Sequence, residues 1–130
     1  VMGHTKCGAV SAAIDLHNRG QSARDMFGCE HLDHLILDIQ KSMNFSRFKK
    51  EFTNYDKFKE ELEIIAIKAN VMQSIDIIKN QSKVIRSLLA SGKIKLVGCV
   101  YDVSCGNVEF FEEEKSVLLG GPVHQETLPQ

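Results

Sequence analysis

The sequence lacks the features that mark several large classes of protein. In 130 residues it has no tryptophan, only two prolines and a formal net charge of -1, without the basic excess usual in nucleic-acid-binding domains. No apolar run approaches the roughly 18 residues that a membrane span requires, and no signal peptide is recognisable. We therefore expect no nucleic-acid partner, no membrane span in this chain and a cytoplasmic location.

Cysteine is present but scattered. The four cysteines do not show the dense, regular spacing of a secreted disulfide framework. In a reducing compartment they are expected to be free thiols or metal ligands: Cys7, Cys29, Cys99 and Cys105.

The length fits one domain, large enough to bury a core without disulfides. The chain starts with Val1, and residues 1–3 resemble the end of a buried strand that runs into a turn. Later strands are too few to complete a sheet. We therefore expect that an N-terminal part is missing from this chain.

Apolar residues at helical spacing predict four main helices. The helix over 31–43 is expected to bury a stripe that includes Leu32, Leu35, Ile36 and Ile39, and the helix over 55–80 has a wider apolar face. Glycines at helix C-terminal ends and Ser82 as an N-cap set the boundaries of the expected helices. The expected helices are 8–17, 31–43, 55–80 and 83–91, with a polar loop over 20–29 and a weaker amphipathic segment, expected to be helical, over 44–54.

The spacing of apolar residues changes after the last predicted helix. Residues 93–103 are rich in β-branched and apolar side chains and predict a buried strand, followed by a turn over 104–107 and a returning strand over 108–111. Several helices combined with strands at both ends indicate an α/β fold in which helices flank a sheet.

The first ten residues, VMGHTKCGAV, contain a candidate metal site. His4 and Cys7, placed at i and i+3 in a strand-to-helix turn, can point at one metal ion, and imidazole with thiolate suits zinc. Gly8 opens the following helix, whose positive N-terminal end favours an anion. His4 and Cys7 are therefore candidate zinc ligands, with a buried thiol beside an unrelated histidine as the alternative, and Gly8 is the candidate substrate-binding residue.

The stretch from Gly3 to Gly8 resembles the second zinc-ligand motif of the β-class carbonic anhydrases. Residues 88–102, which end in a Tyr-Asp pair, are similar to the late helix and strand of that family. The resemblance covers a domain over 1–111, the C-terminal portion of such a fold without its N-terminal strands. Residues 112–130 are expected to form an acidic and then loose tail.

The resemblance implies a lyase, carbonate dehydratase, in which zinc activates water to hydrate carbon dioxide reversibly to bicarbonate, in a homodimer or larger oligomer. The family takes a further cysteine and a catalytic Asp-Arg pair from a C-x-D-x-R motif. No such motif occurs in this chain, so these residues are expected upstream of Val1. We expect weak zinc binding and little activity from this chain alone.

Two other functions stay open. The segments 28–32 and 38–42 look like carbonic-anhydrase-type domains associated with bacterial SulP-type anion transporters, which suggests a non-catalytic regulatory or bicarbonate-sensing domain. A redox protein that uses Cys7 as its reactive thiol is the third reading. His31 and His34 share a helix face, where a solvated surface is favoured over a metal site, and the Tyr101-Asp102 pair is expected to close strand geometry.

Overall fold

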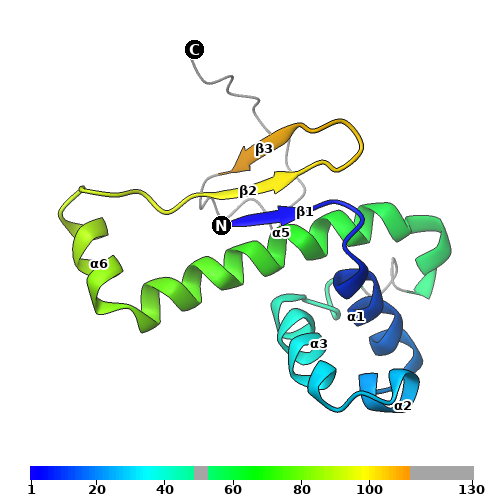
Figure 1. Ribbon diagram of the computed structural model, residues 1–130. Helices are drawn as coiled ribbons and strands as arrows, with labels where there is room; N and C mark the ends of the chain where they lie inside the picture. The colour runs from blue at the N-terminus through cyan, green and yellow to red at the C-terminus, as the bar shows by residue number, and fades with distance from the viewer. Residues whose placement is uncertain (49–52, 112–130) are drawn as a thin grey trace.

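The computed structural model describes residues 1–48 and 53–111 (Figure 1). It confirms an α/β fold in which helices flank a small sheet. The predicted tail over 112–130 lies outside the described residues. The elements are β1 (Met2–His4), α1 (Gly8–Arg19), α2 (Ala23–Phe27), α3 (His31–Ser42), α5 (Tyr55–Gln81), α6 (Lys83–Ala90), β2 (Gly98–Tyr101) and β3 (Val108–Phe111).

The three strands form one sheet in the order β1-β2-β3. β1 pairs with β2 in parallel, with Gly3 opposite Val100, and β2 pairs with β3 in antiparallel register, with Cys99 opposite Phe110. Because side chains alternate along a strand, the sheet has two distinct faces. The inner face, toward α5, carries Gly3, Gly98, Val100, Glu109 and Phe111, and the outer face carries Met2, His4, Cys99, Tyr101, Val108 and Phe110.

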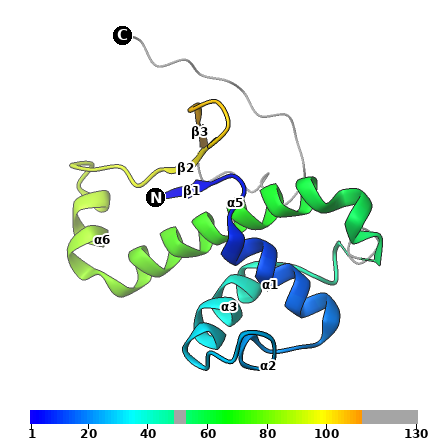
Figure 2. The same ribbon diagram turned by 45° about the vertical axis from the view of Figure 1, so that its right-hand side comes forward.

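The 27-residue helix α5 lies between the sheet and the group formed by α1, α2 and α3 (Figures 1 and 2). It approaches the strands closely because glycine leaves room: a Cβ atom on Gly3 would stand 2.6 Å from Cγ2 of Ile67. On Gly98 a Cβ would stand 3.1 Å from Cγ1 of Val71 in α5, and 2.7 Å from the ring of Phe111 in β3. These positions therefore let β1 and β2 rest directly on the helix.

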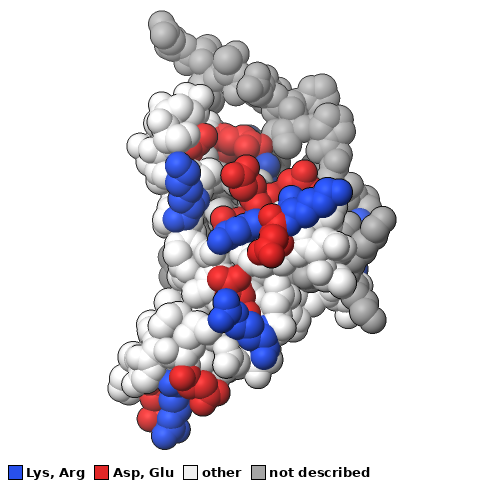
Figure 3. All heavy atoms as spheres, turned by 90° about the vertical axis from the view of Figure 1, so that its right-hand side faces the viewer, with Lys and Arg blue, Asp and Glu red and all other residues white. Residues whose placement is uncertain are grey.

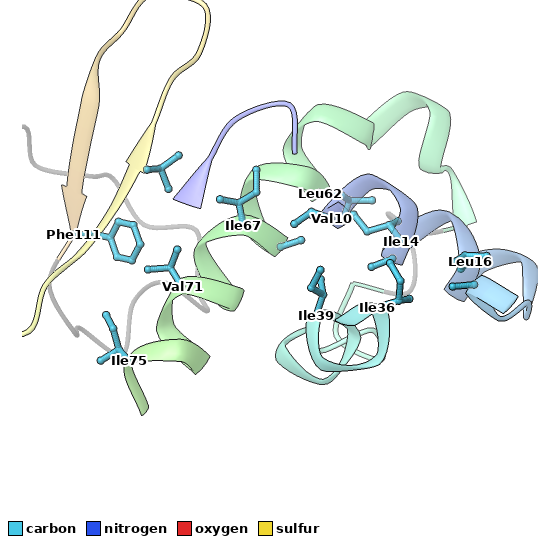
Figure 4. Packing of buried hydrophobic residues seen from close by; sticks show 14 residues of the cluster. Val10, Ile14, Leu16, Ile36, Ile39, Leu62, Ile67, Val71, Ile75 and Phe111 are labelled. Atoms are coloured by element: carbon cyan, nitrogen blue, oxygen red, sulfur yellow. The ribbon is translucent and has the colours of Figure 1, made fainter. Parts of the chain in front are cut away.

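The hydrophobic core follows α5 along both of its sides (Figure 4). Ile67, Val71 and Ile75 meet the inner face of the sheet, whereas Leu62 meets the α1 and α3 side. α1 contributes small and branched residues, including a fully buried Ala13, so that it packs closely. The buried residues on that side are Val10, Ala13, Ile14, Leu16, Ile36, Ile39, Leu62 and Ala66.

The main helices begin and end close to their predicted limits. Gly20 ends α1 with a left-handed φ of 61°, and the Ser82 side chain caps α6 by accepting a hydrogen bond from the Ile85 amide. Charges of both signs are interspersed on the face shown in Figure 3. Within the described ranges, no helix is long and apolar enough to cross a membrane.

The predicted polar loop over 20–29 is wrong in part, because it contains the short helix α2. The Ser22 side chain accepts a hydrogen bond from the Asp25 amide, and the Asp25 carboxylate accepts one from the Ser22 amide. This reciprocal capping box stabilises a helix too short to show a period. Of the weak helix predicted over 44–54, residues 45–48 form a turn, and 49–52 lie outside the described residues.

Several residues predicted to be buried are exposed. Leu32 and Leu35 of α3 face outward, the latter with 51% of its surface exposed, because α3 turns Ile36 and Ile39 toward α1 and α5. β1 is an edge strand within the described sheet, and Met2 is 61% exposed. α6 extends past the sheet and buries none of its residues.

The strand predicted over 93–103 is shorter in the structure. Only Gly98–Tyr101 form β2, and residues 94–97 approach it without regular strand structure. A strand needs partners for its backbone hydrogen bonds. The ladder with β1 covers residues 99–101 and the ladder with β3 covers Gly98–Tyr101, so the extent of β2 coincides with its paired residues and not with the whole stretch of high β propensity.

Candidate metal centre

The candidate metal centre lies at the carboxyl end of β1. His4 is the last residue of β1 and pairs with Tyr101 of the parallel strand β2. Its side chain is exposed on the outer face of the sheet, whereas Gly3, the residue before it, faces α5 on the inner face. The carboxyl ends of parallel strands meet at one edge of a sheet, which is where open α/β sheets place ligands.

The His4 ring is held in one orientation by its neighbour. Nδ1 of His4 lies 2.9 Å from the carbonyl oxygen of Thr5. Because a carbonyl only accepts, Nδ1 is the donor in this contact, and in the neutral tautomer that donates from Nδ1 the lone pair is on Nε2. Metal-ligating histidines usually have this arrangement, with one nitrogen donating to a carbonyl and the other on the metal.

Cys7 and Gly8 occupy the start of α1. Cys7 is the N-cap residue, and its carbonyl oxygen accepts a hydrogen bond from the Ser11 amide at 3.0 Å. The Cys7 side chain makes no capping hydrogen bond to the first amides of α1, which begin at Gly8. The half-buried Cys7 side chain therefore lies beside the positive end of the α1 helix dipole, which favours a nearby anion.

The turn between His4 and Cys7 contains a strained residue. Lys6 has a φ of 55°, and it is the one non-glycine residue with positive φ in the described part of the chain. A left-handed backbone is unfavourable for a residue with a Cβ atom and persists where its surroundings impose it. Because Lys6 lies between His4 and Cys7, its backbone conformation helps to set where the two candidate ligands stand relative to each other.

Thr5 and Asp102 connect this turn to the end of β2. The Thr5 amide donates to the carbonyl of Tyr101 at 2.9 Å, and Oγ1 of Thr5 donates to Oδ1 of Asp102 at 3.3 Å. Asp102 also closes the β2–β3 turn, because its Oδ1 accepts hydrogen bonds from the amide and hydroxyl of Ser104. These hydrogen bonds from Ser104 lower the pKa of Asp102 to about 2.

Within the part of the chain that the structure describes, no third candidate ligand joins His4 and Cys7. Among residues 1–48 and 53–111, no group of three or more His, Cys, Asp or Glu side chains is arranged to hold a metal ion. His31 and His34 are exposed on α3. The donor chemistry of His4 and Cys7 fits two positions of a zinc site.

The four cysteines are free thiols. Cys99 is buried in β2, where its Sγ lies 3.6 Å from the carbonyl of Val1, and Cys105 is exposed in the β2–β3 turn. Neither side chain belongs to a metal-holding group within the described residues.

A separate pocket of about 630 Å³ lies between the end of α1 and the start of α5. Its lining includes Asp15, Arg19 and Tyr55, and none of the candidate zinc-site residues. Burial raises the pKa of Tyr55 to about 12. His17, in the last turn of α1, stacks on Phe45 at 3.4 Å between ring centroids, and burial lowers its pKa.

Comparison with known proteins identifies one family. The family model described as carbonic anhydrase matches residues 1–108, which include the candidate metal turn and all described elements up to the first residue of β3. No curated protein matches the chain.

Proposed function

The chain belongs to the carbonic anhydrase family, and on this premise we propose that it is a β-class region that binds zinc through His4 and Cys7 and serves the reversible hydration of carbon dioxide to bicarbonate. The observation that carries the proposal is the strand-to-helix turn, in which the hydrogen bond to Thr5 leaves Nε2 of His4 open. The protein would then be a carbonate dehydratase, a zinc lyase.

Each residue of the turn has a part in this proposal. His4 offers an imidazole nitrogen whose direction is set by the Thr5 carbonyl, and Cys7 offers a sulfur ligand beside the positive end of α1. Gly8, whose position leaves open space around its Cα, lets an anionic substrate or product approach the first amides of the helix. Zinc, when bound, supplies Lewis acidity that lowers the pKa of water to about 7.

The ligand set needs completion for catalysis. A catalytic zinc site usually has three protein ligands and one open position. We propose that the third ligand, together with the Asp-Arg pair that the family resemblance implies, is supplied from outside the described residues. The chain by itself is then expected to bind zinc weakly and to show little activity.

A second function is favoured by the incomplete ligand set. Since the described residues hold no group of three metal-binding side chains, the region also suits a non-catalytic, bicarbonate-sensing or regulatory role beside an anion transporter. The resemblance of residues 28–32 and 38–42 to transporter-associated domains supports this alternative.

Location and assembly are part of the proposal. Four free thiols suit a reducing compartment, which supports a cytoplasmic location. The exposed apolar side chains on the outer face, among them Met2 and Phe110, support a homodimer or larger oligomer. Sedimentation velocity of the purified chain over a concentration series measures the assembly directly.

The central test is metal content with matched variants. The chain, His4→Ala, Cys7→Ser and the control His34→Ala are equilibrated with zinc, and bound metal and carbon dioxide hydration are measured. We expect zinc retention to fall in His4→Ala and Cys7→Ser but not in His34→Ala, because His34 is exposed on α3 away from the turn. Hydration above the uncatalysed rate supports the enzyme, and zinc binding without hydration supports the regulatory role. Equal zinc retention by all four proteins would refute His4 and Cys7 as ligands.

A further inference from the structure

We propose that Thr5 and Asp102 are positioning residues that hold the turn between His4 and Cys7 in its metal-binding shape. This pair, the Thr5–Asp102 clamp, joins the two candidate ligands to the end of β2. The inference deepens the proposed function and rests on it as far as zinc is concerned. Neither residue is assigned contact with the metal.

Thr5 is bonded to the end of β2 by both its backbone and its side chain. Its amide donates to the Tyr101 carbonyl at 2.9 Å, which extends the parallel pairing of β1 beyond His4. Its Oγ1 accepts a hydrogen bond from the Val103 amide at 3.0 Å and donates to Oδ1 of Asp102 at 3.3 Å. A hydroxyl group that both accepts and donates in this way cannot be replaced by a methyl group.

Asp102 gives the clamp a rigid base. Its amide donates to the Asn107 carbonyl at 2.8 Å, and its own carbonyl accepts from the Gly106 amide at 2.8 Å. Its carboxylate is held by the Ser104 amide at 2.8 Å and by the Ser104 hydroxyl at 2.6 Å. The side chain that meets Thr5 is therefore fixed by the β2–β3 turn.

The other end of the metal turn is fixed by α1. The Cys7 carbonyl accepts the first hydrogen bond of that helix, from the Ser11 amide. Lys6, which lies between the two fixed ends, has the unfavourable φ of 55°. A strained conformation persists when its surroundings determine it, and the clamp with α1 provides those surroundings.

Thr5 also sets the direction of the His4 ring. The Thr5 carbonyl lies 2.9 Å from Nδ1 of His4, so a shift of Thr5 turns the imidazole as well as the backbone that leads to Cys7. Loss of the clamp is therefore expected to act on both candidate ligands. Changes to residues that support metal ligands typically lower metal affinity by about 10- to 100-fold.

The first test measures the affinity for Co²⁺, a spectroscopic substitute for zinc. Thr5→Val keeps the shape of Thr5 but removes its hydroxyl, Thr5→Ser keeps the hydroxyl, and Asp102→Ala removes the acceptor. We expect Thr5→Val and Asp102→Ala to bind Co²⁺ at least about tenfold more weakly, with a loss of the thiolate-to-cobalt absorption band. Thr5→Ser is expected to retain the affinity of the unchanged chain.

Ser104→Ala is the matched control. It removes one hydrogen bond to the same carboxylate of Asp102 but leaves the bond to Thr5. If the role of Asp102 were only to stabilise the β2–β3 turn, Ser104→Ala and Asp102→Ala would weaken Co²⁺ binding alike. The clamp instead predicts a loss of affinity in Asp102→Ala alone.

The second test needs no metal and keeps the two proposals apart. A left-handed residue has a short distance between its amide and α protons, so Lys6 gives a strong intraresidue NOE in the metal-free protein. We expect this NOE to weaken in folded Thr5→Val and to persist in Thr5→Ser and Ser104→Ala. An unchanged Lys6 NOE in Thr5→Val would overturn the clamp. The expected NOE pattern in a chain that binds no Co²⁺ would keep the clamp and refute the zinc ligands.

Discussion

The inner and outer faces of the sheet are built from the same strands but do different work. On the inner face, Val100 and Phe111 are buried against α5, and Gly3 allows the close approach of the helix. On the outer face, His4 is exposed and Phe110 keeps 50% of its surface accessible. Because alternation places neighbours on opposite faces, one strand both anchors the core and presents a candidate ligand.

This difference shows which interactions keep β1 and the candidate ligand His4 in position. β1 has only three residues, yet Gly3 lies on Ile67 and Val71 of α5. His4 follows directly and needs no buried contact of its own. The inner face therefore fixes the position of the strand, and hydrogen bonds at its end fix the direction of the ligand.

The largest expected effect comes from truncating two neighbouring phenylalanines that lie on opposite faces of the sheet. Phe111→Ala removes a ring that is 91% buried on the inner face (9% exposed), and we expect a loss of about 3 kcal/mol in the free energy of unfolding. Phe110→Ala, on the outer face, is expected to cost less than about 1 kcal/mol. Urea unfolding of both variants measures the difference. Equal losses would show that the outer face is covered in solution.

The next effect tests close approach. Gly3→Ala places a Cβ 2.6 Å from Cγ2 of Ile67 and 2.9 Å from Cγ2 of Val71, so we expect a loss of about 1–3 kcal/mol from overpacking. Gly8→Ala is the matched control, since nothing lies within 4 Å of its added Cβ and Gly8 opens α1. We expect this control to be neutral or to gain up to about 1 kcal/mol. Thermal and urea unfolding compare the two, and a tolerated Gly3→Ala would mean that α5 can move away from β1.

Much of the fold could be predicted from periodicity and end signals. The limits of α5 and α6 followed from a long apolar pattern and from the Ser82 cap, both of which are local properties. The length of β2 could not be predicted, because it depends on which residues pair with β1 and β3 and not on local β propensity. Helix α2 was missed because its signal is the single capping box of Ser22 and Asp25 rather than a repeat.

The candidate ligands could be named from the sequence, but the residues proposed to position them could not. His4 and Cys7 stand in a short local motif, and their identity as ligands stays a prediction. The Thr5–Asp102 clamp joins residues from two distant segments and depends on the parallel register of β1 and β2. An available signal was a hydroxyl residue beside one candidate ligand and an aspartate at the end of a neighbouring strand, although the sequence does not show that they meet.

The smallest expected effect is electrostatic and compares an inner-face ion pair with an exposed one. Nζ of Lys68, in α5, lies 2.8 Å from Oε1 of Glu109, and the Lys68 side chain is only 16% exposed. Lys68 also lies over the ring of Phe111 at 5.8 Å from its centroid. The pair of Lys41 and Asp38 has a similar separation, 2.9 Å, but both of its side chains are well exposed.

Double-mutant cycles with Lys68→Met and Glu109→Gln, and with Lys41→Met and Asp38→Asn, measure the coupling in each pair. We expect about 1 kcal/mol for the inner-face pair and about 0.3 kcal/mol or less for the exposed pair, because solvent screens exposed charges and the ordering of long side chains offsets the attraction. Raising the ionic strength should reduce the exposed coupling more than the inner-face coupling. Equal coupling and equal salt dependence would mean that water reaches Lys68 as freely as it reaches Lys41, and that packing against α5 does not protect the inner face from solvent.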